Sequence, residues 1–213
     1  MESPMIYELH RPKNYKAGEK YPALFVMHGI GSNEKNMMSM VNGLEDSFFI
    51  FSIRGHILQG PGFAYFTIQG YGKPHREVFD EGVNKLTNFI DYACNQYSLD
   101  ESRLYVLGFS QGAILAMTLG LTLEKLKGVV ALSGYIPAFV KEEYTIKPSK
   151  QLSVFISHGN MDQVLPYEWG TENVEYFKKL GIPVTFKTYP EGHSVSYENL
   201  QDFQQWIIND VKK

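Results

Sequence analysis

The chain has 213 residues, of which 44% are hydrophobic and 20% charged, so the composition predicts one globular domain over residues 1–213 with a sizeable core. A formal net charge of −3 gives no reason to expect nucleic acid or an anionic membrane as a partner, and the single cysteine, Cys94, excludes an internal disulfide and a multi-cysteine metal site. The sequence has no signal-peptide pattern and no apolar run near the ~18–20 residues that span a bilayer, so we expect a cytoplasmic protein without a membrane span.

Apolar runs of strand length recur along the chain, and stretches of helical length separate them. The expected strands lie at residues 5–10, 21–27, 47–53, 103–109, 128–133, 152–157 and 184–189. The expected helices lie at residues 34–44, 77–97, directly after Ser110, 168–180 and 197–211. Residues 55–74 and 135–151 show no clear period. The length of the first of these segments predicts a functional loop.

The alternation of strands and helices from Tyr21 onward predicts an α/β fold, with a mostly parallel central sheet covered by helices on both faces. In open sheets of this kind, ligands bind outside the carboxyl ends of the strands. The residues with candidate chemistry that follow expected strands are His28, Arg54, Ser110, Asp162 and His193. All of them are therefore expected at the same edge of the sheet.

The pattern Gly108-Phe109-Ser110-Gln111-Gly112 follows an apolar strand and precedes an apolar helix. A Gly-x-Ser-x-Gly sequence at such a turn is the nucleophile elbow of α/β-hydrolases, in which the turn exposes the serine hydroxyl. Glycines flank the serine because the strand and the helix cross too closely there to leave room for a Cβ atom. The pattern predicts that Ser110 is a nucleophile.

A serine nucleophile needs a histidine that takes its proton, and the histidine needs a carboxylate on its other ring nitrogen. In α/β-hydrolases both partners follow the serine along the chain, and the histidine comes last. His158 and His193 are the histidines that follow Ser110. We expect His193 to be the base, because it follows the last strand in a Gly-His-Ser turn.

The expected acid is Asp162, because it is the only aspartate between Ser110 and His193 and it follows the end of an expected strand. Glu168 and Glu191 remain as alternatives. Glu168 is expected to open a helix, and Glu191 is close to the histidine in sequence.

Acyl transfer also needs N–H donors for the oxyanion of the tetrahedral intermediate. One donor is expected from the backbone of Gln111, directly after the nucleophile. The other is expected from the glycine-containing loop His28-Gly29-Ile30-Gly31, where Ile30 N–H is our choice. His28 is expected to hold that loop by a hydrogen bond.

Together these segments resemble the phospholipase/carboxylesterase family of small α/β-hydrolases, which includes carboxylesterases, lysophospholipases and acyl-protein thioesterases. The matching stretches are residues 28–31, 108–112, 133–137, 158–166 and 191–194. The resemblance implies a Ser110–Asp162–His193 triad and an oxyanion hole from Ile30 and Gln111. It also implies hydrolysis of carboxylic esters or thioesters without a cofactor or a metal.

The loop after the second central strand departs from the family pattern. Family members often carry a tryptophan there, where this chain has Ala64-Tyr65-Phe66. Arg54-Gly55, followed by a glycine-rich aromatic loop, is more similar to the bacterial carboxylesterase branch than to the eukaryotic thioesterases. Residues 133–152 leave no room for a large lid domain, so we expect an open pocket for short acyl chains. The candidate substrate contacts are Arg54, Tyr65, Phe66 and Tyr135, with Phe63 and Phe139 as further pocket rings.

The leading hypothesis is a serine carboxylesterase that acts on small, short-chain esters, as a monomer or a homodimer. An acyl-protein thioesterase or a lysophospholipase is the alternative within the same chemistry. A non-catalytic protein that binds a small ligand on a hydrolase scaffold is the alternative from another class.

Overall fold

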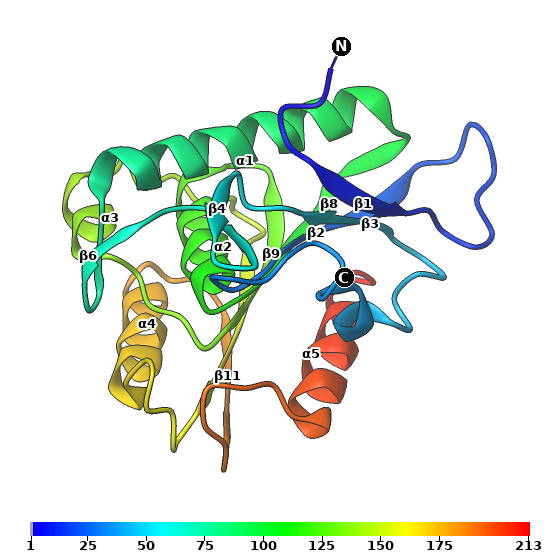
Figure 1. Cartoon of the computed structure of the whole chain (residues 1–213). Helices are drawn as coiled ribbons and strands as arrows, with labels where there is room; N and C mark the ends of the chain where they lie inside the picture. Colours follow the sequence, from blue (N-terminus) through cyan, green and yellow to red (C-terminus); the bar gives the residue numbers. More distant parts are fainter. Residues whose placement is uncertain (1) are drawn as a thin grey trace.

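A computed structural model describes residues 2–213, and its centre is a seven-stranded sheet (Figure 1). In spatial order the strands are β1 (Tyr7–His10), β3 (Phe49–Ile53), β2 (Tyr21–Met27), β8 (Leu99–Phe109), β9 (Leu126–Leu132), β10 (Ser153–Gly159) and β11 (Val184–Tyr189). Only the edge strand β1 runs antiparallel to its neighbour within this sheet, and the remaining pairs are parallel. The expected mostly parallel sheet is confirmed.

Helices cover both faces of the sheet, because successive strand residues point to opposite faces and nearly all of them are apolar. The helices are α1 (Arg76–Gln96), α2 (Gln111–Thr122), α3 (Ala138–Glu143), α4 (Tyr167–Lys179) and α5 (Tyr197–Asp210). On one face Phe25 and Val106 of the sheet belong to a core with apolar residues of α1, α2 and α4. On the other face Leu24 and Leu107 pack in a core with α5. The expected α/β-hydrolase architecture is confirmed.

The segment expected to form a helix at residues 34–44 is mostly turns, and only the 3-10 helix Met38–Val41 forms there. Met37, Val41 and Leu44 are buried at helical spacing, which explains the prediction. The backbone hydrogen bonds in this segment join residues three apart instead of four: the N–H of Met38 donates to Lys35 at 3.3 Å, and that of Met40 donates to Met37 at 3.1 Å.

Residues 55–74, where no regular element was expected, form two small hairpins. The hairpins pair β4 (Ile57–Gln59) with β5 (Gly62–Ala64), and β6 (Ile68–Gly70) with β7 (Lys73–Pro74). Between Ser133 and Leu152 the chain forms only α3 and connecting segments, which agrees with the expected absence of a large lid.

The carboxyl ends of the central strands bring together the segments that carry the candidate chemistry. His28 follows β2, Arg54 follows β3, Ser110 follows β8, and Asp162 lies just beyond β10. His193 lies in the loop between β11 and α5. Within residues 2–213, no helix has both the length and the apolar character needed to cross a bilayer.

Candidate active site

Ser110 lies in a sharp turn between β8 and α2, with a backbone φ of 53° and ψ of −114° that non-glycine residues seldom adopt. The flanking glycines leave no room for side chains. A Cβ atom on Gly108 would lie 2.1 Å from Gly112 backbone atoms, and a Cβ atom on Gly112 would lie 2.1 Å from the carbonyl oxygen of Met27. This close crossing of strand and helix is what the glycine spacing predicts.

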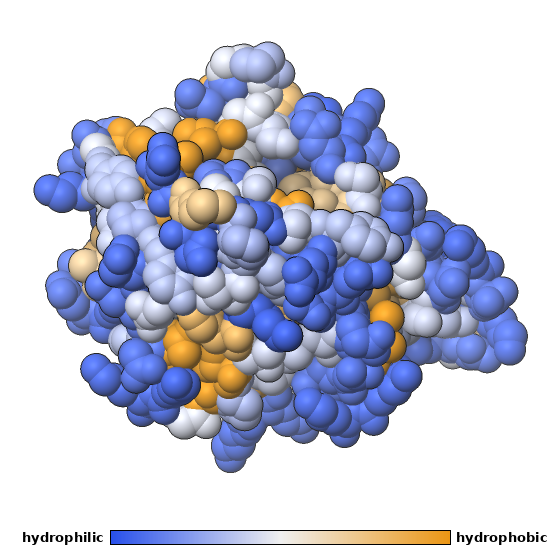
Figure 2. All heavy atoms as spheres, turned by 90° about the horizontal axis from the view of Figure 1, so that it is seen from below, coloured by the Kyte–Doolittle hydropathy of each residue, from blue (hydrophilic) through white to orange (hydrophobic). Residues whose placement is uncertain are grey.

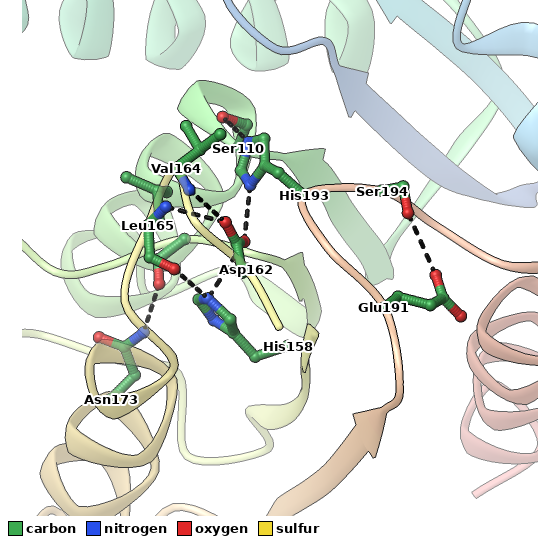
Figure 3. A network of polar contacts seen from close by, with 10 residues as sticks. Ser110, His158, Asp162, Val164, Leu165, Asn173, Glu191, His193 and Ser194 are labelled. Atoms are coloured by element: carbon green, nitrogen blue, oxygen red, sulfur yellow. Dashed lines mark hydrogen bonds and ion pairs between the residues drawn. The ribbon is translucent and has the colours of Figure 1, made fainter. Parts of the chain in front are cut away.

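Three side chains from separate strand ends lie in line beside this turn (Figure 3). Nε2 of His193 is 2.8 Å from Oγ of Ser110, and its Nδ1 is 2.7 Å from Oδ2 of Asp162. Each imidazole nitrogen therefore has one partner. This arrangement allows Nε2 to accept the serine proton while the carboxylate holds Nδ1–H.

Two backbone N–H groups of its own loop hold the carboxylate of Asp162. The amides of Val164 and Leu165 donate to Oδ1 at 2.8 and 2.9 Å. Burial disfavours the charge on this carboxyl, but the hydrogen bonds from His193 and from these two amides outweigh it and hold the pKa of Asp162 below its usual range. Asp162 is therefore ionised at neutral pH and oriented toward His193.

The two candidate oxyanion donors flank the nucleophile. Gly29 approaches so closely that a Cβ atom on it would lie 3.4 Å from Cβ of Ser110, which places the Ile30 loop beside the serine. Gln111 directly follows the serine. Within residues 2–213, the backbone N–H groups of Ile30 and Gln111 donate no hydrogen bond, so both are free for an acyl oxygen.

Buried hydrogen bonds fix the loop that carries Ile30. Nδ1 of His28 lies 2.7 Å from the carbonyl oxygen of Gly29, and its Nε2 accepts the N–H of Gly55 at 2.9 Å. The hydroxyl of Tyr65 accepts the N–H of His28 at 3.2 Å and donates to Ile53 at 2.6 Å. Burial lowers the pKa of His28, which keeps the ring neutral in this structural role.

The far end of the same loop is held by an ion pair. Arg54 donates to both carboxylate oxygens of Glu34, at 2.7 and 2.5 Å, and the Glu34 side chain is only 2% exposed. The guanidinium of Arg54 also lies 4.6 Å from the centre of the Phe63 ring. The N–H donors of Arg54 that form these bonds are thus used by another side chain of the same protein.

A pocket of about 140 Å³ opens next to Ser110 and is mostly apolar. Its lining residues are Ile30, Phe66, Ile68, Tyr71, Gly72, Ser110, Gln111, Ile114, Tyr135, Val164 and Leu165. Phe66 and Tyr135 were among the expected substrate contacts. Arg54 and Tyr65 are not in this lining, so we do not retain them as substrate contacts. Arg54 pairs with Glu34, and Tyr65 is fully buried with its hydroxyl bonded to backbone.

The two further aromatic candidates also lie outside this lining. Phe63 packs under Arg54, and Phe139 packs against Phe79 at 5.2 Å between ring centres. Both rings therefore serve packing elsewhere in the fold.

An aromatic contact closes one end of the pocket. Tyr71, at the tip of the β6–β7 hairpin, lies 5.0 Å from the ring of Trp169 on α4, and Tyr135 lies 4.7 Å from the same ring. Gly72 permits this docking, because a Cβ atom there would be 2.7 Å from the Trp169 ring. A second hollow of about 330 Å³ lies beyond the contact and shares Gly72 and Tyr135 with the first.

Several lining residues were missed by the sequence reasoning. Val164 and Leu165 lie two and three residues after Asp162, so their place in the same strand-end loop was an available signal. Ile68 and Tyr71 carry no such signal, because they reach the pocket only through the β6–β7 hairpin, which has no recognisable period.

The hydropathy of the surface and the exposed side chains of the pocket describe how the pocket meets solvent. Seen from below, the molecule is largely hydrophilic, and its hydrophobic residues occur in separate patches (Figure 2). Four of the apolar side chains that line the pocket are themselves exposed by 44 to 61%, namely Ile30, Ile68, Tyr71 and Val164. The pocket therefore has an apolar entrance.

Comparisons with known proteins agree on fold and family. A model of the phospholipase/carboxylesterase family matches residues 14–209. Acyl-protein thioesterase 1 of Candida albicans is 36% identical over 164 residues, which cover 70% of this chain and 70% of that protein. The putative hydrolase MhqD of Bacillus subtilis is 24% identical over 198 residues, with 90% and 95% coverage. A Bacillus cereus carboxylesterase structure has a TM-score of 0.84 at 22% identity, covering 97% of this chain and 94% of that one.

Proposed function

Because this chain belongs to the phospholipase/carboxylesterase family, whose relatives are named as thioesterases and carboxylesterases, we propose that it is a serine carboxylesterase for small esters with short acyl groups. The observation that carries the proposal is the line of hydrogen bonds from Ser110 through His193 to Asp162, at 2.8 and 2.7 Å. Beside it lie two unused backbone N–H groups and an apolar pocket.

In this mechanism Oγ of Ser110 attacks the ester carbonyl carbon while its proton passes to Nε2 of His193. The carbonyl electrons move to the oxygen, and this oxyanion accepts hydrogen bonds from the backbone N–H groups of Ile30 and Gln111. When the tetrahedral intermediate collapses, the alcohol leaves with the proton from His193 and Ser110 stays acylated. Water then attacks the acyl-enzyme in the same way and releases the carboxylic acid and free Ser110.

The size of the pocket supports short acyl groups. At about 140 Å³ it is close to the ~150 Å³ of a cavity that holds a benzene ring, so an acyl chain of about four to six carbons fills it. The contact between the rings of Tyr71 and Trp169 lies at the end of the pocket. A longer chain has to displace this contact or leave the pocket through its entrance.

A thioesterase or lysophospholipase activity on longer acyl groups is the second candidate. The observation in its favour is the second hollow of about 330 Å³ beyond Trp169, which would extend the pocket if the aromatic contact opened. Relatives from Candida albicans and Debaryomyces hansenii, 36% and 31% identical to this chain, carry the name acyl-protein thioesterase 1.

A series of p-nitrophenyl esters from acetate to palmitate, together with one acyl thioester of each length, separates the two candidates. We expect the highest kcat/KM at acetate to hexanoate. We expect Ser110→Ala to lose activity on the order of 10⁶ in kcat, as in other triad enzymes. A maximum at palmitate or its thioester would favour the second candidate, and near wild-type turnover by Ser110→Ala would refute the site.

A further inference from the structure

A second histidine lies beneath the acid of the triad. His158 is the last residue but one of β10, and its side chain has no exposed surface (Figure 3). The ring packs against the first turns of α4, where a Cβ atom on Gly170 would lie 2.8 Å from Nδ1. The triad chemistry itself does not use this ring.

The hydrogen-bond partners of His158 define its protonation state. Nε2 lies 3.0 Å from the carbonyl oxygen of Leu165, which can only accept, so Nε2 carries a hydrogen. Nδ1 is buried and has no hydrogen-bond partner within residues 2–213. A second ring proton would therefore be buried without an acceptor, and burial lowers the pKa of His158 accordingly. The ring is neutral, with its hydrogen on Nε2.

The same Nε2–H group lies close to the catalytic carboxylate. Nε2 of His158 is 3.4 Å from Oδ2 of Asp162, the oxygen that lies 2.7 Å from Nδ1 of His193. The titratable groups around the His158 ring are Asp162, His193, and Tyr167 and Glu168 of α4. Of these, only Asp162 lies within 4 Å of the ring as an ion-pair partner among the described residues.

His158 also closes the turn that carries the acid. The amide of Leu165 donates to Oδ1 of Asp162, while the carbonyl of Leu165 accepts from His158. Leu165 in turn lines the substrate pocket. One buried imidazole thus joins the end of β10, the acid and the pocket wall.

We propose that His158 is a positioning residue, whose neutral Nε2–H fixes the turn from Asp162 to Leu165 and directs a dipole at Oδ2. This inference rests on the proposed function, because it concerns the basicity of His193 in that triad. The dipole stabilises the negative charge on Asp162 and so moderates how strongly the carboxylate stabilises protonated His193. Without it, the carboxylate would stabilise protonated His193 more strongly.

Two variants test the role. His158→Leu keeps a similar volume and removes the N–H donor. We expect kcat on p-nitrophenyl butyrate to fall about 10- to 100-fold, the usual effect of losing a hydrogen-bonded supporting partner. We also expect the acidic limb of kcat/KM to move up by at most about one pH unit, because the Nε2–H group is shared with Leu165 and its contact with Oδ2 is weaker than a full neutral hydrogen bond. His158→Gln can place an amide donor near the Nε2 position. We expect this variant to restore most of kcat and to return the acidic limb close to its wild-type position.

Ser157→Ala is the matched control, because Ser157 is the neighbouring fully buried residue of β10 and its hydroxyl has no partner among the described residues. We expect its kcat and its pH profile to equal those of the wild type. Thermal unfolding establishes that each variant is folded.

The proposal is overturned if His158→Leu matches the wild type, or if both His158 variants lose activity equally without a shift of the acidic limb. If His158→Leu does not fold, His158→Gln decides: a wild-type acidic limb supports the role, and a loss beyond tenfold contradicts it. Wild-type activity that survives Ser110→Ala would refute the proposed function instead, and the positioning role with it.

Discussion

The side-chain amide of Gln111 is bonded to the backbone at Tyr65. Its Oε1 accepts the N–H of Tyr65 at 2.7 Å, and its Nε2 donates to the carbonyl oxygen of Phe66 at 2.8 Å. The residue that we propose as a backbone N–H donor to the oxyanion therefore also holds the segment from which Phe66 lines the pocket. Tyr65 carries the connection onward, because its hydroxyl bonds the backbone of His28 and Ile53.

Substitution of Gln111 tests this connection without removing the oxyanion donor, because the backbone N–H stays. Gln111→Met loses both hydrogen bonds and leaves two buried backbone groups unpaired, each at a cost of about 1–3 kcal/mol. We expect a lower unfolding temperature and a higher KM for butyrate esters. Gln111→Glu keeps only the acceptor for the N–H of Tyr65, so we expect it, like Gln111→Met, to lower the unfolding temperature and raise KM. Wild-type KM and stability in both variants would contradict the connection.

The contact between Tyr71 and Trp169 is expected to set the acyl-chain limit. Tyr71→Ala removes the ring that separates the two hollows and lets an acyl chain extend into the second. Two additional buried methylene groups at ~0.8 kcal/mol each predict an increase of about tenfold in the ratio of kcat/KM for octanoate over hexanoate esters.

Tyr197→Ala is the control for this variant, since Tyr197 is 74% exposed at the start of α5 and does not line the pocket. Its ratio of octanoate to hexanoate activity should equal that of the wild type. An unchanged ratio in Tyr71→Ala, with acetate turnover intact, would show that another feature limits chain length.

The ion pair between Arg54 and Glu34 is expected to stabilise the fold. Arg54→Met leaves the buried carboxylate of Glu34 without its partner, so we expect a loss of about 3 kcal/mol. This is the lower end of the range for breaking a buried pair, because the guanidinium keeps 27% exposure. Lys13→Met breaks an exposed pair with Asp46 and a partly exposed pair with Glu45, and should leave the unfolding temperature nearly unchanged.

This contribution also depends on pH. The hydrogen bonds from Arg54 hold the pKa of Glu34 below its usual range, against the opposing effect of burial. A carboxyl with a lowered folded-state pKa stabilises the fold above its unfolded pKa of ~4.3, and this stabilisation is lost as the pH falls through the folded value. Chemical denaturation at pH 7 and at acidic pH should therefore show the difference between wild type and Arg54→Met shrinking below about pH 4. A difference that is independent of pH would contradict the assignment.

The strands, the elbow and the order of the triad residues were predictable from the sequence, because each rests on local patterns. Apolar runs bounded by polar loops identify strands, and glycine spacing identifies the elbow. The roles of Arg54 and Tyr65 were not predictable. Arg54 finds its partner 20 residues earlier at Glu34, and Tyr65 bonds to strand ends 12 and 37 residues away. Such pairings are set by tertiary packing, which a single sequence does not reveal.

The shape of the pocket depends on similar long-range contacts. Tyr71 meets Trp169 of α4 because it lies at the tip of a short hairpin, whose two strands of three and two residues carry no periodic signal. The missing helix at residues 34–44 has a local cause instead. Its backbone hydrogen bonds run from a residue to the third one before it, as from Met38 to Lys35 and from Met40 to Met37, although the apolar spacing is helical.

The central claim is that His193 and Asp162 activate Ser110 as a nucleophile. The most direct measurement is labelling of the native protein with a fluorophosphonate, followed by mass spectrometry of the modified peptide. We predict one adduct per chain on Ser110 in the wild type, a much slower reaction in His193→Ala and none at this position in Ser110→Ala. A wild-type protein that hydrolyses esters without forming this adduct, or that reacts equally fast when His193 is replaced, would contradict the account.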